Sequence, residues 1–505
     1  MVNFLLRHRA LLLIMALSLG LKLLFLWQGE VVNPDSATYI AAAQKHAQGL
    51  YAEGLRFYRM PFYPLMLAGV HAMIPNWIYA GQVLTVVPLV LCLWPLYLLT
   101  CRLFDHRTAV GAGLLFAVLP SFNVSATAIE RDPLFLLFSL TALLYLVLIV
   151  QEGRLCWWVS FFLVGVLAIL TRVEGVVLPI VAVFGVLFLR HESDERCSVS
   201  RSNLNMLVLA SGCVLLLIAG IKLFGDEQFS RLNEVFYWGQ ELLSRDFFSA
   251  YLGLMEALKV FQETLPAADL HNNLIETTRH YAPLIYFVGM LEMMLKIVFP
   301  TSLIALWMQQ RWSPLTSWSR ERWILLAVVV MIVGVNLLFC IKHNFTTERY
   351  LWLACACLLP WVGMGMTACW QRCQRRSFAL LLCGLLFVGA PLVKTLSVVI
   401  QKQDRTVALA GKWLKDYDPD ESLTIIYNDR RLPLYAGRAQ DVVDVRDLSW
   451  LHDNVGNDPR ITFLAIYVSN NKNENYTVPG FDVIKRFSGA KKTALFMQRS
   501  TGARN

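Results

Sequence analysis

Eleven apolar stretches constrain this chain more than any other feature, because each is near the length of about 20 residues that a helix needs to cross a bilayer. Hydrophobic residues make up 56% of the 505 residues and charged residues only 16%, a balance that excludes an ordinary soluble protein. The sequence therefore predicts a polytopic α-helical membrane protein with about eleven spans. The predicted spans are residues 10–28, 79–101, 108–124, 133–150, 155–171, 173–190, 205–223, 283–308, 323–341, 350–367 and 377–399.

Two apolar segments need separate decisions. Residues 10–28 follow the basic Arg7 and Arg9 as in a signal peptide, but no small-residue cleavage site precedes Asp35, so we expect a retained helix. Residues 61–75 are bounded by prolines and are too short for a span, so we expect an interfacial helix. With the N-terminus inside, arginines then gather in the inner connections, as the positive-inside rule requires.

This orientation places residues 29–78, 125–132, 171–174, 224–282 and 342–349 on the outer face, together with everything after residue 400. Apolar residues at helical spacing in 224–282 predict amphipathic helices at the membrane surface. Residues 1–399 form the predicted membrane domain, and 400–505 a separate small α/β domain. In it we expect a helix over 405–417 and strands over 423–427, 442–445, 461–468, 481–487 and 493–497.

Ionisable side chains recur on the predicted outer face, where burial near the membrane is costly and usually serves function. Carboxylates can deprotonate an acceptor hydroxyl, while Arg and Lys can hold a phosphate leaving group, so this set suits group transfer from an anionic lipid phosphate. Two of the carboxylates could instead share a divalent cation. The net charge of +9 is spread in short clusters between apolar runs, which argues against a nucleic-acid partner. The residues concerned are Asp35, Arg59, Glu130, Arg131, Asp132, Arg172, Glu174, His280, Tyr281, Lys342 and Arg349.

Each of these residues also has a structural interpretation. Asp35 follows a proline and precedes a helical run, so it could be an N-cap or a first-turn carboxylate, and Asp132 before Pro133 is open to the same interpretation. Arg172 and Glu174 are spaced for a structural ion pair. Lys and Arg at helix ends often anchor in the interface by extending toward water.

The order of four motifs resembles the GT-C class of integral-membrane glycosyltransferases, specifically the protein-mannosyltransferase and aminoarabinose-transferase-like superfamily. The motifs are Pro34-Asp35-Ser36-Ala37-Thr38-Tyr39, the patch from Arg59 to Leu65, Asp132 at a helix start, and Leu170-Thr171-Arg172-Val173-Glu174-Gly175. Ser36 stands where the family pattern has an acidic residue, and Met60 where it has a proline. The resemblance implies a polyprenyl-phosphate sugar as donor and a bacterial inner-membrane location, with the N-terminus cytoplasmic and the C-terminal domain periplasmic.

The resemblance also implies roles for individual residues. Asp35 would be the general base or a metal-linked carboxylate, Asp132 the second acidic partner, and Arg59 the contact of the donor phosphate, with Asp35 and Asp132 as the candidate metal ligands. From the ionisable and aromatic side chains of the predicted outer face, rather than from the resemblance, we also expect Glu130 as a catalytic carboxylate, Arg131, Lys342 and Arg349 at the donor phosphate, and Tyr39, Tyr63, His280 and Tyr281 at the substrates. The predicted enzyme moves a hexosyl or pentosyl group to a hydroxyl or amine of a lipid, glycan or protein. The alternatives are a transporter of lipids or lipid-linked sugars and a scaffold whose C-terminal domain binds a partner; charges gathered at one face favour the enzyme.

Overall fold

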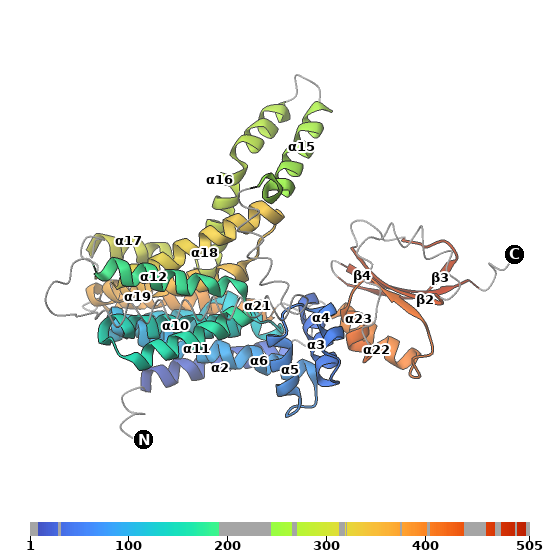
Figure 1. Ribbon diagram of the computed structural model, residues 1–505, viewed down its shortest axis with the longest axis horizontal. Helices are drawn as coiled ribbons and strands as arrows, with labels where there is room; N and C mark the ends of the chain where they lie inside the picture. The colour runs from blue at the N-terminus through green and yellow to red at the C-terminus, as the bar shows by residue number, and fades with distance from the viewer. Residues whose placement is uncertain are drawn as a thin grey trace. The chain divides into compact units, whose positions relative to one another are not determined.

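Figure 1 shows the computed structural model, in which helices predominate and one small sheet lies near the C-terminus. The structure describes residues 9–28, 32–190, 244–264, 270–312, 319, 321–373, 376–400, 405–438, 461–469, 476–489 and 492–500. The chain divides into two compact units. The first unit comprises residues 1–22, 85–124 and 131–398, and the second comprises residues 23–84, 125–130 and 399–505.

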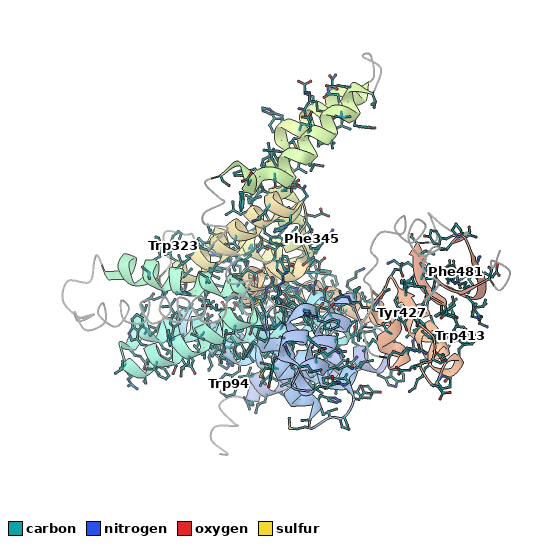
Figure 2. All side chains as sticks on the ribbon, turned by 45° about the vertical axis from the view of Figure 1, so that its right-hand side comes forward. Trp94, Trp323, Phe345, Trp413, Tyr427 and Phe481 are labelled. Carbon is teal, nitrogen blue, oxygen red and sulfur yellow. The ribbon has the colours of Figure 1, made fainter. Side chains whose placement is uncertain are left out.

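The first unit is a bundle of apolar helices, in which α10 packs against α11 and α19 packs against α8. Its backbones approach closely: a Cβ on Gly363 would lie 2.7 Å from the carbonyl oxygen of Thr108, so α19 requires glycine there. Trp323 and Phe345, labelled in Figure 2, mark the two ends of α18 and are 40% and 53% exposed, as aromatic residues at membrane interfaces are. The helices are α7 (Leu93–Leu103), α8 (His106–Val118), α9 (Pro120–Val124), α10 (Asp132–Glu152), α11 (Leu155–Thr171), α12 (Val177–Arg190), α15 (Ser249–Glu263), α16 (Leu270–Val298), α17 (Ser302–Trp312), α18 (Arg322–His343), α19 (Trp352–Cys373), α20 (Ser377–Gly384) and α21 (Ala390–Ile400), with the short 3-10 segments η2 (Val173–Val176) and η5 (Glu348–Leu351). Two further helices are α2 (Arg9–Gln28) and α6 (Trp77–Leu91); both of them, and the last residues of α21, run across the boundary between the units.

Ten of the predicted spans fall on helices, and the eleventh, 205–223, lies outside the described residues. The single span predicted over 283–308 is wrong, because α16 ends at Val298 and α17 begins at Ser302; Pro300 disfavours helical geometry at Phe299. Pro120 similarly separates α8 from α9, which are bent by 54°. By length and composition, seven helices among the described residues can cross a membrane, or eight if the bent pair is one span, so the number eleven stays a prediction.

The second unit contains three short helices from the predicted first outer loop: α3 (Pro34–Ala47), α4 (Tyr51–Phe57) and α5 (Phe62–His71). The helix predicted over 61–75 is therefore present as α5. Its ten residues would span about 15 Å, half of a bilayer core, so it is too short to cross a membrane. Its location at the interface stays a prediction. In the other outer segment, 224–282, helices are present as α15 and the start of α16, while 224–243 and 265–269 lie outside the described residues; their amphipathic role at the membrane surface stays a prediction.

The C-terminal part of the second unit is the predicted small α/β domain. Its sheet has the order β1-β2-β4-β3, with β1 parallel to β2 and the other pairs antiparallel. Trp413 of α22, labelled in Figure 2, packs on one face against Phe496 at a centroid distance of 4.6 Å, while Leu464, Leu495 and Met497 are buried on the other. The elements are α22 (Thr406–Tyr417), β1 (Ile425–Tyr427), α23 (Arg431–Ala436), β2 (Phe463–Ser469), β3 (Phe481–Ser488) and β4 (Lys492–Arg499). Four predicted strands are confirmed, the fifth (442–445) lies outside the described residues, and α23 was not predicted.

Candidate active site

The first turn of α3 presents Asp35 to the surface. Asn33 is the N-cap of this helix, because its Oδ1 accepts hydrogen bonds from the Ser36 amide at 2.8 Å and the Ser36 hydroxyl at 2.6 Å. Asp35, two residues after the cap, is exposed, and the helix dipole favours a carboxylate in this first turn. Asn33 therefore supplies the cap, and Asp35 is an exposed carboxylate in the first turn of the helix.

Ser36 fixes this turn to the segment that carries Glu130. It is fully buried, and its hydroxyl accepts a hydrogen bond from the Ile129 amide at 3.0 Å. The other end of Asn33 reaches the same segment, since its Nδ2 donates to Glu130 Oε1 at 2.6 Å. The serine that replaces the acidic residue of the family pattern thus has a structural role, and two links hold the Asp35 turn in place.

An aromatic cluster lies beneath the same turn. The ring of Tyr39 makes edge-to-face contacts with Tyr58 at 4.8 Å and Tyr63 at 4.9 Å, and all three side chains are buried. Arg59 is exposed between the buried Tyr58 and Met60, so its backbone is anchored on both sides while its guanidinium faces outward. The structure thus brings Asp35, Glu130 and the tyrosines together in one unit with Arg59.

The first unit contains a second, buried cluster centred on Arg172, which is only 2% exposed. Its guanidinium pairs with Asp132 Oδ1 and with Glu174, whose Oε2 accepts from Nε at 3.1 Å, and it stacks over the Tyr350 ring at 4.4 Å. Arg349 Nη1 lies 3.9 Å from Asp132 Oδ2. The predicted Arg172–Glu174 ion pair is present. The third member, Asp132, could not be anticipated because forty residues separate it from Arg172 and no spacing signals the contact.

These contacts decide whether a divalent cation fits the predicted ligands. Both oxygens of Asp132 face a guanidinium, which occupies and neutralises the carboxylate that a metal would need. Within the described part of the chain, no three side chains among His, Cys, Asp and Glu gather as a metal site would require. The surroundings of Asp132 therefore do not fit a metal ligand, and Asp132 is better described as the anchor of two arginines.

A groove of about 490 Å³ in the first unit runs beside this cluster. Its walls are apolar side chains of α12 and α18, among them Ile180, Val335 and Phe339. Arg131, Glu174, Asn336, His343 and Tyr350 supply its polar lining. Arg131 is mostly buried and donates from Nη1 to the Thr171 carbonyl at 3.4 Å. An apolar channel with a cation in its lining suits a lipid that has an anionic head.

Three other predicted site residues lie elsewhere in the first unit. Lys342 Nζ sits 5.3 Å from the centroid of the Phe247 ring, and His280 contacts the ring of Tyr281 at 4.7 Å on α16. Among the described residues that line the groove, none of these three is present. The structure thus forms two clusters from the predicted site residues, and the chain passes from one to the other at the consecutive residues Glu130 and Arg131.

Comparisons with known proteins agree with this architecture. Residues 59–221 match a family model described as dolichyl-phosphate-mannose-protein mannosyltransferase. Among solved structures, ArnT from Cupriavidus metallidurans bound to undecaprenyl phosphate is 14% identical with a TM-score of 0.56, over 97% of this chain and 98% of that chain. The oligosaccharyltransferase AglB from Archaeoglobus fulgidus, in complex with an inhibitory peptide and a dolichol-phosphate, is 12% identical with a TM-score of 0.59, over 91% and 69%. A comparison with curated proteins finds no match.

These likenesses concern the fold, which is that of the GT-C integral-membrane glycosyltransferases. Within that class the chain resembles the mannosyltransferase and aminoarabinose-transferase-like proteins, which confirms the resemblance indicated by its motifs. The region matched by the family model includes Arg59, Asp132 and Arg172 but begins after Asp35.

Proposed function

We propose that the protein is a glycosyltransferase that moves a sugar from a polyprenyl-phosphate donor to an acceptor hydroxyl or amine at the outer face of the bacterial inner membrane. The N-terminus is cytoplasmic and residues 400–505 are periplasmic in this proposal. The observation that carries it is the exposed Asp35 carboxylate, held on a turn that Asn33 and Ser36 fix to the Glu130 segment. The undecaprenyl phosphate bound by ArnT and the dolichol-phosphate bound by AglB support the class of donor.

In the proposed reaction, Asp35 accepts the proton of the acceptor hydroxyl or amine. The freed electron pair forms a bond to the anomeric carbon of the donor sugar. The bond between that carbon and the phosphate oxygen breaks, and the polyprenyl phosphate leaves with the bonding electrons. Arg59 stabilises the negative charge that grows on the leaving phosphate, because an anchored cation needs little reorganisation during the reaction.

The groove between α12 and α18 takes the isoprenoid chain in this proposal. Its apolar walls match a hydrocarbon. Asp132 and Glu174 act indirectly, since they fix Arg172 and thereby the start of α12 that forms one wall of the groove. Tyr39 and Tyr63 support the Asp35 turn from below.

A transfer assay with purified protein in detergent and labelled polyprenyl-phosphate sugars tests this proposal. Asp35→Asn removes the base and keeps the size of the side chain, so it should abolish transfer while the protein still folds and binds undecaprenyl phosphate. Asp105→Asn is the matched control, because Asp105 caps α8 by accepting from the amides of Arg107 and Thr108, and asparagine caps equally well. Lipid movement across vesicles without transfer would instead identify a transporter.

A further inference from the structure

The second unit contains a pocket that the proposed reaction does not use. It has a volume of about 370 Å³ and lies between the C-terminal half of α3 and the residues that follow α23. Its lining includes Gln44, Lys45, Gln48, His71, Trp77 and Arg438.

Direct hydrogen bonds join the C-terminal domain, which supplies one wall of this pocket, to α3, which supplies the other, and to Val32 just before α3. The Tyr435 hydroxyl accepts a hydrogen bond from the Val32 amide at 2.9 Å, and Arg430 Nη1 donates to Thr38 Oγ1 at 3.2 Å. Gly411 lets α22 support α23 from behind, because a Cβ there would lie 2.4 Å from the Cβ of Tyr435. The pocket is therefore formed in advance of any ligand.

The charged groups in the pocket wall are already paired. Lys45 Nζ lies 3.0 Å from Glu53 Oε2, and Arg438 forms a buried ion pair with Asp418. Burial opposes ionisation of Asp418, but hydrogen bonds from Arg438, Leu423 and Ser422 outweigh it and lower the pKa of Asp418 to about 2, so the pair stays charged at neutral pH. A pocket with paired charges offers donors and acceptors but little net charge. This balance suits a neutral ligand rich in hydroxyl groups better than an anion.

The remaining lining favours the same ligand chemistry. The indole of Trp77 stacks on the His71 ring at 3.6 Å, which holds both rings rigidly at the wall. Two glutamine amides provide both donors and acceptors. His71 Nδ1 is buried with no hydrogen-bond partner among the described residues, so the wall also has an unmet hydrogen bond. An aromatic wall combined with amides and fixed ion pairs matches the apolar faces and hydroxyl edges of a sugar.

We propose that this pocket binds a neutral saccharide unit of the acceptor. The inference rests on the proposed function, because Asp35 and Lys45 are ten residues apart on α3, about 15 Å along the helix axis. An acceptor that reaches from the pocket to Asp35 must extend beyond a single sugar. The acceptor class is thus a glycan or a glycolipid with several sugar units.

The test is direct binding of neutral disaccharides of glucose, mannose and N-acetylglucosamine to the full-length protein in nanodiscs, measured by ligand-observed NMR. The Asp35→Asn protein is the background, so that binding is observed without turnover. We expect at least one disaccharide to bind and Trp77→Ala to weaken it by about tenfold, the worth of one ring contact of about 1.4 kcal/mol. Gln48→Leu should weaken the same disaccharide without disturbing the stacked rings.

Tyr79→Ala is the matched control, since Tyr79 is an exposed aromatic residue on the same helix α6 outside this pocket. It should leave disaccharide binding unchanged, and none of the three variants should alter binding of undecaprenyl phosphate. Equal binding by the Trp77→Ala, Gln48→Leu and Tyr79→Ala proteins overturns the inference, as does binding of glucosamine 1-phosphate alone. The proposed function fails by a different result, full transfer activity of Asp35→Asn, so the two failures can be told apart.

Discussion

Arg172→Ala is the substitution whose cost the structure defines best. It leaves the Asp132 side chain, which is 4% exposed, with Arg349 at 3.9 Å as its nearest cation, and it removes the stacking on Tyr350. Removing one partner of a buried ion pair costs about 3–5 kcal/mol, and the lost stacking adds about 1 kcal/mol. We therefore expect a loss of about 4 kcal/mol or more. Arg172→Lys keeps the charge but loses the paired hydrogen bonds, so it should cost about half as much.

Thermal unfolding in detergent measures this loss. At roughly 2 °C per kcal/mol, Arg172→Ala should lower the midpoint by about 8 °C or more. The midpoint of the double variant Asp132→Asn/Arg172→Ala should fall by less than the sum of the decreases in the two single variants, because each single change leaves the other partner buried without its ion pair. A midpoint for Arg172→Ala within 2 °C of the unchanged protein, or strictly additive losses, would refute the buried-pair account.

Two further predictions concern other parts of the molecule. Val335→Trp fills the groove and should weaken undecaprenyl phosphate binding at least tenfold. Val330→Trp is the control, because Val330 is exposed on the same helix outside the groove, and it should leave the affinity unchanged. Equal affinities for the two variants would exclude the groove as the lipid site. The pKa of Asp418 is about 2 in the folded protein against an ordinary 3.8, so its pair with Arg438 stabilises the C-terminal domain above pH 4, and this stabilisation is lost as the pH falls toward 2. The protection factors of the β2 and β4 amides, which correct for the intrinsic pH dependence of exchange, should fall over that range. Asp418→Asn, which has no such carboxylate, should show reduced protection already at pH 7; unchanged protection in that variant would contradict the role of the pair.

The helices of the bundle could be predicted because a bilayer demands long apolar windows, and such windows are visible in any sequence. The breaks inside them follow from local chemistry as well. Pro300 and Pro120 both sit within predicted spans, and giving more weight to these prolines would have predicted both interruptions. The helix α23 was missed because six residues containing Pro433 do not form a periodic pattern.

Only part of the candidate site could be predicted from the sequence. That Asp35 opens a helix could be predicted, but the assignment of the cap to Asn33 required the structure, although Asn before Pro34 is a recognisable helix start. The contact between Asp132 and Arg172 joins residues forty positions apart, and the burial of Tyr39 depends on Tyr58 and Tyr63 in another segment. Such tertiary contacts have no local signature.

The measurement that tests the central claim most directly is the rate of sugar transfer by the Asp35→Asn protein, compared with Asp105→Asn under the same conditions. A positioned general base contributes a factor of about 10²–10⁴ to the rate, so Asp35→Asn should lose at least a hundredfold while Asp105→Asn keeps the full rate. Both variants should bind undecaprenyl phosphate with equal affinity. A transfer rate for Asp35→Asn equal to that of Asp105→Asn would contradict the assignment of Asp35 as the base.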